Sequence, residues 1–154
     1  MKQHKMVVIA AAVSVLVSAA VSAQNAFNDA DKAVEYRQKA FSVMQNNFAA
    51  MGDMVRGDAP FDAAIFAARA ADFAAMTTIP WPAFDTAGAQ PGNNSDALAA
   101  IWSNRDDFNQ RAVKLQADAK ALAEIAAAGV EAESRKAFMT AARNCKACHD
   151  QYKD

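Results

Sequence analysis

Two cysteines and a histidine near the end of the chain have the types and spacing of a chemical site. They form the run Cys145-Lys146-Ala147-Cys148-His149, a CxxCH motif. Thiols at this spacing can add to the two vinyl groups of a haem and form thioethers, and the next imidazole can ligate the iron. On a helix Cys145 and Cys148 lie about 60° apart and His149 about 40° from Cys145, so all three share one face. The motif predicts one haem c per chain, covalently held through Cys145 and Cys148, with His149 as an axial ligand.

The start of the chain predicts export. Its first five residues carry three basic side chains, and residues 6–21 are apolar apart from two serines. Small residues then lead to Ala23, as they do before a signal-peptide cleavage site. We expect residues 1–23 to be a cleaved signal peptide and residues 24–154 to form one periplasmic domain. The alternative is a retained membrane anchor, which the short length and the Ala and Ser content of the stretch disfavour.

Three other interpretations of the cysteine pair remain open at this point. A disulfide suits an exported protein, but a redox-active CxxC opens a helix after a strand, whereas this one closes the last expected helix. A zinc site needs four ligands, and the mature chain offers only His149 beside its two cysteines. The motif can also arise by chance. Export favours haem attachment, because bacterial c-type haem is attached outside the cytoplasm.

Without the signal peptide the chain is mildly acidic. Two of its 16 Lys and Arg residues lie in the peptide, so 14 remain against 17 Asp and Glu, a net charge of −3. It shows no basic stripe, so we expect no nucleic acid and, after cleavage, no membrane as partner. Its apolar content is dominated by Ala, with few β-branched residues, which favours helix over strand.

Four helical segments are expected, at residues 29–55, 60–78, 103–129 and 130–153. In the first, apolar residues recur at spacings of three, four and seven. Gly57 is expected to cap it, and Pro60 to lie in the first turn of the second. The second is expected to face inward through Phe61, Ile65, Ala68, Met76 and Ile79.

The third segment is expected to begin at Ser103 as its N-cap, with a start near Asp96 as the alternative. Its Phe108, Leu115 and Leu122 follow heptad spacing. The only long irregular connection is residues 80–95. This pattern predicts an all-α fold, an antiparallel four-helix bundle with covalently attached haem.

The chain resembles cytochrome c′, the class II c-type cytochromes, over nearly all of its mature length. Four segments carry the resemblance: Ala33-Val34-Glu35-Tyr36-Arg37-Gln38, Ile79-Pro80-Trp81, Ile101-Trp102-Ser103 and Cys145-Lys146-Ala147-Cys148-His149-Asp150. The resemblance implies a homodimer with five-coordinate, high-spin haem iron that binds small gases, chiefly nitric oxide and carbon monoxide. The resemblance is also the main reason to expect that the dimer uses the first two helices. Met51 and Met54 lend this modest support, because they extend the apolar surface of the first helix beyond a narrow stripe.

The resemblance also implies roles for individual residues. Arg37 and Gln38 fall beside the haem, Asp96 makes a loop contact with it, and Phe41 covers the distal haem face, where the family usually has Leu or Met. Lys153 stands where the family often has Arg. Lysine keeps the positive charge but lacks the planar donor fork of arginine. Independently of the resemblance, Arg37 is a cation on the apolar stripe one turn before Phe41, where a haem propionate can pair with it. The alternative is an arginine that reaches water from the bundle edge.

Two other functions compete with gas binding. A six-coordinate, low-spin electron carrier, serving a redox partner protein, would fill both axial positions, with Met44 as the first candidate for the sixth ligand. Met51, Met54 and Met76 are further candidates, although methionine more often fills gaps in a core. A thiol oxidoreductase would be colourless. We expect no enzyme activity, because no general base is evident and His149, the only histidine of the mature chain, is assigned to iron.

Overall fold

The computed structural model of the protein describes residues 27, 29–86, 89–90 and 94–154. The expected signal peptide, residues 1–23, lies outside the described residues. The described chain forms five α-helices and one 3-10 helix: α1 (Ala30–Arg56), α2 (Ala63–Met76), η1 (Trp81–Phe84), α3 (Ala100–Ser103), α4 (Arg105–Ala127) and α5 (Glu131–Tyr152). No helix within these ranges is long and apolar enough to cross a membrane.

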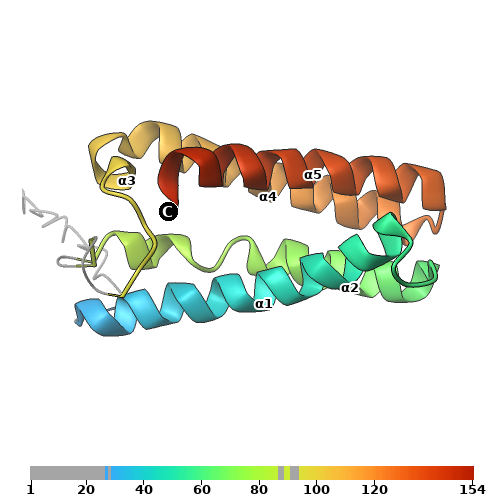
Figure 1. Ribbon diagram of the computed structural model, residues 1–154, viewed down its shortest axis with the longest axis horizontal. Helices are drawn as coiled ribbons and strands as arrows, with labels where there is room; N and C mark the ends of the chain where they lie inside the picture. Colours follow the sequence, from blue (N-terminus) through green and yellow to red (C-terminus); the bar gives the residue numbers. More distant parts are fainter. Residues whose placement is uncertain (1–26, 28, 87–88, 91–93) are drawn as a thin grey trace, which may run out of the picture.

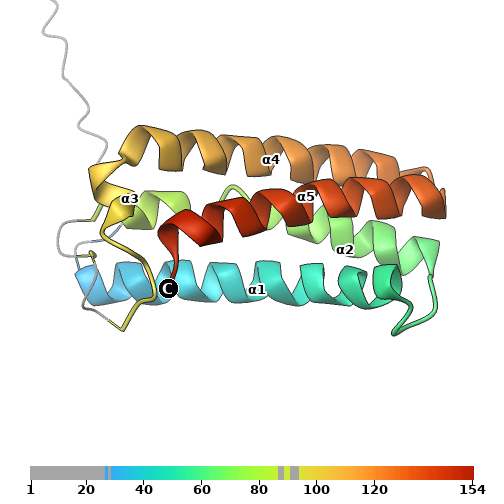
Figure 2. The ribbon, with the colours of Figure 1, turned by 45° about the horizontal axis from the view of Figure 1, so that its top comes forward.

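The four long helices pack as an antiparallel bundle (Figure 1). Helix α1 packs on α2, α2 on α4 and α4 on α5, while α5 meets α1 over a shorter length. The end of α5 therefore lies at the same end of the bundle as the start of α1, as Figure 2 shows. The expected all-α four-helix bundle is confirmed.

Helix α1 has a defined cap at each end. At its start the Asp29 carboxylate accepts hydrogen bonds from the backbone N–H groups of Asp31 at 2.9 Å and Lys32 at 3.1 Å, which would otherwise lack partners. At its end Gly57 adopts φ 84°, a left-handed conformation that side chains with a Cβ rarely take. The expected stop at Gly57 is confirmed.

The second helix differs from its expected start and face. It begins at Ala63, with Asp62 as N-cap, so Pro60 precedes the helix. Of the residues expected to face inward, Phe61 and Met76 pack against the core, whereas Ile65, Ala68 and Ile79 are exposed. The prediction was wrong because Ala occupies almost every face of α2 and leaves the stripe undefined. The large rings of Phe66 and Phe73, which gain more from burial, decide the orientation.

The start of the third long helix also differs. Ser103 ends the short helix α3, and α4 begins after a break at Asn104, whose φ is −129°. The expected N-cap at Ser103 is therefore wrong, and so is a helix start near Asp96. The heptad prediction is confirmed, since Phe108, Leu115 and Leu122 are all buried.

Two apolar clusters of the bundle pack against the last turns of α5. The central cluster has twelve buried residues: Met44, Met51, Met54, Phe66, Ala70, Phe73, Leu115, Ala119, Leu122, Ala126, Phe138 and Ala141. The end cluster lies nearer the end of α5 and contains Phe84, Ile101, Phe108 and Tyr152. Met51 and Met54 are both buried, so the expectation that they provide apolar surface for a partner is wrong. Helix α1 packs against α2 and α5, and its inward face is wider than a single stripe.

Candidate functional site

The two cysteines lie on the inward side of α5 near its end. Both are free thiols and half-buried. Cys145 packs against the central cluster, and Cys148 packs against the end cluster. The spacing of the apolar residues in α5 places Phe138, Ala141 and Tyr152 on the same buried side of the helix. The structure therefore brings the two thiols together where the bundle core meets its end.

The surroundings make both thiols poor nucleophiles in the folded protein. Burial raises the pKa of the Cys145 thiol to about 11, and the neighbouring Cys148 adds to the rise. Burial also raises the pKa of Cys148, and the positive charge of Arg111 offsets part of that rise. Redox-active CxxC pairs instead have a cysteine with a lowered pKa. This disfavours the thiol oxidoreductase interpretation.

His149 follows the cysteines at the edge of the bundle and is more exposed than either. Partial burial lowers the pKa of its imidazole, and the adjacent charge of Lys153 lowers it further. Both effects favour the neutral ring, which is the form that ligates a metal. Burial and the Lys153 charge therefore favour the ring form that the expected role of His149 requires.

Among the described residues, Arg37 is the only charged side chain that is buried. It is 2 % exposed, and its guanidinium donates hydrogen bonds to the Ala89 carbonyl at 2.8 Å and to Ser95 Oγ at 3.0 Å. It also lies 4.4 Å from the ring centre of Phe84. Within the described ranges no carboxylate lies within ion-pair distance of it, and burial lowers its pKa. The alternative of an arginine that reaches water at the bundle edge is wrong.

This environment fits a haem. A buried guanidinium is costly without an anion, and it has five N–H donors in a planar fork suited to a carboxylate. A haem carries two propionate carboxylates and a large apolar ring. The Arg37 guanidinium could hold a propionate, while the two clusters beside Cys145 and Cys148 could contact the ring. Residues of this chain thus match both the polar and the apolar parts of the group.

Gln38 is next to Arg37 on α1, and Asp96 lies in the loop that precedes α3. The Gln38 amide donates to the Asn94 carbonyl at 2.6 Å. Asp96 is exposed and forms an ion pair with Lys153 at 3.0 Å. Backbone pairing joins Ala97 to Lys153 in an isolated antiparallel bridge. Asp96 is therefore tied to the last turn of α5, four residues beyond His149.

Phe41 lies one turn after Arg37, where the clusters meet. Its ring makes edge contacts with Trp81, at 5.8 Å between ring centres, and with Phe84, at 6.2 Å. Among the described residues, Phe41 and Trp81 are the two that pack against both clusters. Phe41 therefore lies close to the core regions that Cys145 and Cys148 contact.

Sequence analysis missed several neighbours of this site. It did not anticipate that Ala89 and Ser95 would accept hydrogen bonds from Arg37, or that Phe84 would lie against its guanidinium. It also missed Arg111, whose side chain reaches the motif from α4. The i,i+4 spacing of Asp107 and Arg111 was the one available signal, but such pairs are common on helix surfaces.

The family model for cytochrome c′ matches residues 32–153. The chain belongs to the cytochrome c′ family. It is 36% identical over 127 residues to cytochrome c′ from Alcaligenes xylosoxydans xylosoxydans, covering 82% of this chain and 97% of that one. Cytochromes c′ are haem proteins that generally carry electrons or bind gases rather than act as enzymes, and covalently bound haem c is implied by the family.

Solved structures of the family show the same bundle. Cytochrome c prime from Shewanella frigidimarina superposes with a TM-score of 0.79 at 41% identity and covers 83% of this chain and 98% of that one. A nitric oxide complex of a mutant cytochrome c prime from Alcaligenes xylosoxidans superposes with a TM-score of 0.75 at 36% identity, covering 83% and 98%. Cytochrome c′ homologues are periplasmic.

Proposed function

We propose that this chain is a periplasmic gas-binding haem protein. Cys145 and Cys148 hold the haem covalently, His149 is the only protein ligand of the iron, and the opposite side is open to nitric oxide and carbon monoxide. The observation that carries this proposal is the position of Phe41, an aromatic ring that cannot ligate iron, between the clusters on which the two cysteines pack. The nitric oxide complex of a structural relative supports the choice of ligand.

The residues around the haem have separate tasks in this proposal. Bound haem supplies an iron centre that can take up a diatomic gas or change its charge by one electron. Arg37 and Gln38 orient the group from α1, and Asp96 contacts it from the loop. Phe41 and Trp81 exclude water from the side opposite His149. These residues bind and shield the group, and none has the arrangement of a general acid or base.

A second function depends on Met44. This residue is buried in the central cluster, against which Cys145 also packs. If its sulfur were the sixth ligand, the iron would be low-spin and the protein would be an electron carrier for a redox partner protein. The optical spectrum of the purified ferrous protein distinguishes the two functions. A broad Soret band indicates five-coordinate iron, whereas sharp, split α and β bands indicate six-coordinate iron.

We expect Met44→Leu to leave the ferric and ferrous spectra nearly unchanged. The two side chains have similar volumes, so the substitution should cost less than about 1.5 kcal/mol of stability and keep the fold. Absorption spectra of both oxidation states provide the measurement. Met51→Leu, in the same cluster, is the matched control. A change from low-spin to high-spin spectra in Met44→Leu alone would identify Met44 as a ligand and favour the electron carrier.

We also propose a homodimer formed through α1 and α2. Val43 is 45% exposed and Ile65 is 51% exposed. Val43 lies one turn before Asn47 on α1, and Ile65 lies one turn before Arg69 on α2. The Arg69 side chain donates a hydrogen bond of 3.1 Å to Asn47 and so joins the two helices. The two apolar side chains thus flank this bond on the outer face of the pair. A two-fold dimer requires such a self-complementary patch.

Sedimentation at micromolar concentration should therefore give the mass of a dimer. Val43→Asp and Ile65→Asp should each shift the protein toward monomer, because a dimer would bury the new charges. Val113→Asp on α4 introduces the same charge at a residue that is 63% exposed, and should leave the dimer intact. A monomer mass for the unaltered protein would contradict the proposed dimer.

A further inference from the structure

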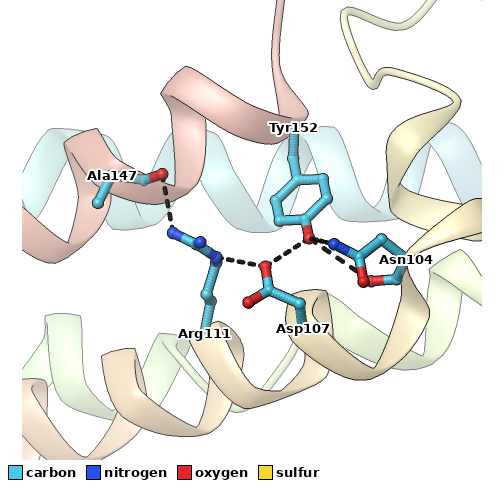
Figure 3. Close-up of polar contacts among 5 residues, drawn as sticks. All are labelled: Asn104, Asp107, Arg111, Ala147 and Tyr152. Carbon is cyan, nitrogen blue, oxygen red and sulfur yellow. Dashed lines mark hydrogen bonds and ion pairs between the residues drawn. The ribbon is translucent and has the colours of Figure 1, made fainter.

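A network of hydrogen bonds connects α4 to the haem-attachment motif on α5. Arg111 on α4 donates from Nη1 to the carbonyl of Ala147, between the two cysteines, at 3.0 Å. Its Nε donates to Asp107 Oδ2 at 2.6 Å. The same carboxylate oxygen accepts the hydroxyl proton of Tyr152 at 2.5 Å, and that hydroxyl accepts a hydrogen bond from Asn104 Nδ2 at 3.1 Å. Figure 3 shows the resulting chain of contacts from α4 to the last turns of α5.

This network differs from the exposed ion pairs elsewhere on the surface. Asp107 and Arg111 are partly buried, and Tyr152 is buried in the end cluster, which also contacts Cys148. Hydrogen bonds from Arg111 and then Tyr152 hold the pKa of Asp107 below its usual range, so the carboxylate stays ionised. Partly buried charges are screened less by water and salt than exposed ones. Each side chain is still about a third exposed, so both charges act on the attachment motif with partial screening.

The network also has a geometry that a lysine in place of Arg111 could not supply. The guanidinium binds a carboxylate and a backbone carbonyl through different nitrogen atoms, which requires the planar fork of arginine. Its positive charge lies at the last turns of α5, where the helix dipole favours a cation. Arg111 thereby joins the turn that carries Cys145 and Cys148 to α4.

We propose that Arg111 and Asp107 are positioning residues of the haem-attachment turn, and that pairing their opposite charges keeps either charge alone from shifting the reduction potential of the haem. This inference rests on the proposed attachment of haem at Cys145 and Cys148. The charge of the haem differs by one between the ferric and ferrous states. A nearby cation favours the less positive ferrous state and a nearby carboxylate favours the ferric state. With both residues present, the two effects largely cancel.

The balance predicts shifts of opposite sign. Arg111→Gln leaves the Asp107 carboxylate unbalanced, so the reduction potential falls. Asp107→Asn leaves the Arg111 guanidinium unbalanced, so the potential rises. At the midpoint potential of the unaltered protein, we expect the ferrous-to-ferric ratio to change roughly threefold to tenfold in each case. The double variant should return close to the original ratio. Simple loosening of the turn would move both single variants in the same direction.

Matched controls separate this effect from net charge. Lys120→Gln removes one positive charge from the same helix, and Asp106→Asn removes one negative charge next to Asp107. Both side chains are exposed and neither contacts the motif. We expect them to shift the ratio much less than the network variants. Arg111→Lys keeps the charge but loses the fork, so it should shift the ratio less than Arg111→Gln. Tyr152→Phe changes no charge but removes a hydrogen bond to Asp107, so it should shift the ratio less than Asp107→Asn.

The experiment is spectroelectrochemical titration of the purified haem-loaded protein, preceded by intact mass measurement of every variant. Opposite shifts for Arg111→Gln and Asp107→Asn, with recovery in the double variant, are the expected result. Shifts in one direction, or shifts no larger than those of the controls, overturn the inference. If one of the two variants does not load haem, the other decides the inference, and a shift of the wrong sign or one no larger than those of the controls overturns it. Failure of both to load haem also overturns it, because the residues would then act on attachment alone. An unaltered protein without covalent haem contradicts the proposed attachment instead.

Discussion

The Cys145→Ala/Cys148→Ala double variant is expected to lose all covalent haem. Thioethers from these two thiols are the proposed covalent links, so no bond to the polypeptide would survive their removal. Each single variant should keep one thioether at most. Denaturing electrophoresis with haem staining, acid–acetone extraction and intact mass provide the measurement. For the unaltered protein we expect the colour to stay with the chain and the mass to exceed that of the bare chain by one haem.

Lys146→Ala is the matched control for this experiment. Lys146 lies inside the motif but is exposed, and it forms a surface ion pair with Asp150 at 2.7 Å, a kind of contact that contributes little to stability. It should retain covalent haem in full. Haem that is extractable from the unaltered protein, or a mass that matches the bare chain, would refute attachment at these cysteines.

Carbon monoxide should bind weakly or slowly to the ferrous protein, and Phe41→Ala should raise both its affinity and its association rate. The Phe41 ring is held by edge contacts with Trp81 and Phe84, so a ligand on that side has to displace a packed aromatic. Such displacement costs on the order of 1–3 kcal/mol in a packed core, which corresponds to roughly 5- to 150-fold in affinity. Optical titration and flash photolysis measure the two quantities.

Val113→Ala controls for the loss of an apolar side chain from the bundle. Val113 is exposed on α4 and lies outside the proposed dimer patch, so carbon monoxide binding should not change. Carbon monoxide binding that is also unchanged in Phe41→Ala would show that the ring lies beside the haem rather than over it. Nitric oxide forms a stronger bond to iron and should still bind, with displacement of His149 from the opposite side as one route.

The sequence patterns predicted the fold where large apolar residues are regularly spaced among polar ones. Phe108, Leu115 and Leu122 repeat every seven residues, and all three are buried. The same method failed in α2, because Ala is small enough for either environment and gives no preferred face. Burial of Phe66 and Phe73 against other helices decides the orientation there, and that information is not local.

The candidate site was partly predictable for a similar reason. CxxCH is local, and its three residues lie within five consecutive positions of one helix. The environment of Arg37 depends on Ser95, 58 residues away. The contact of Arg111 with the Ala147 carbonyl spans 36 residues. Neither pairing has a sequence signature, because each depends on how the loop and α4 pack against the ends of other helices. The resemblance to cytochrome c′ supplied the role of Arg37, but not the residues that enclose it.

The two ends of the bundle are closed by very different lengths of chain. At one end, short connections at Gly57 and Gly129 join neighbouring helices. At the other end, Arg37 donates hydrogen bonds to Ala89 and Ser95, and backbone hydrogen bonds join residues 96–98 to residues 152–154. These contacts close much longer stretches of chain. Closing a longer loop costs more conformational entropy. We therefore expect the end that carries Cys145 and Cys148 to form last during folding and to open first by local fluctuation. The thiols are half-buried once it closes, so haem attachment has a natural time window, while three helices are already assembled and the final turns of α5 are not yet docked.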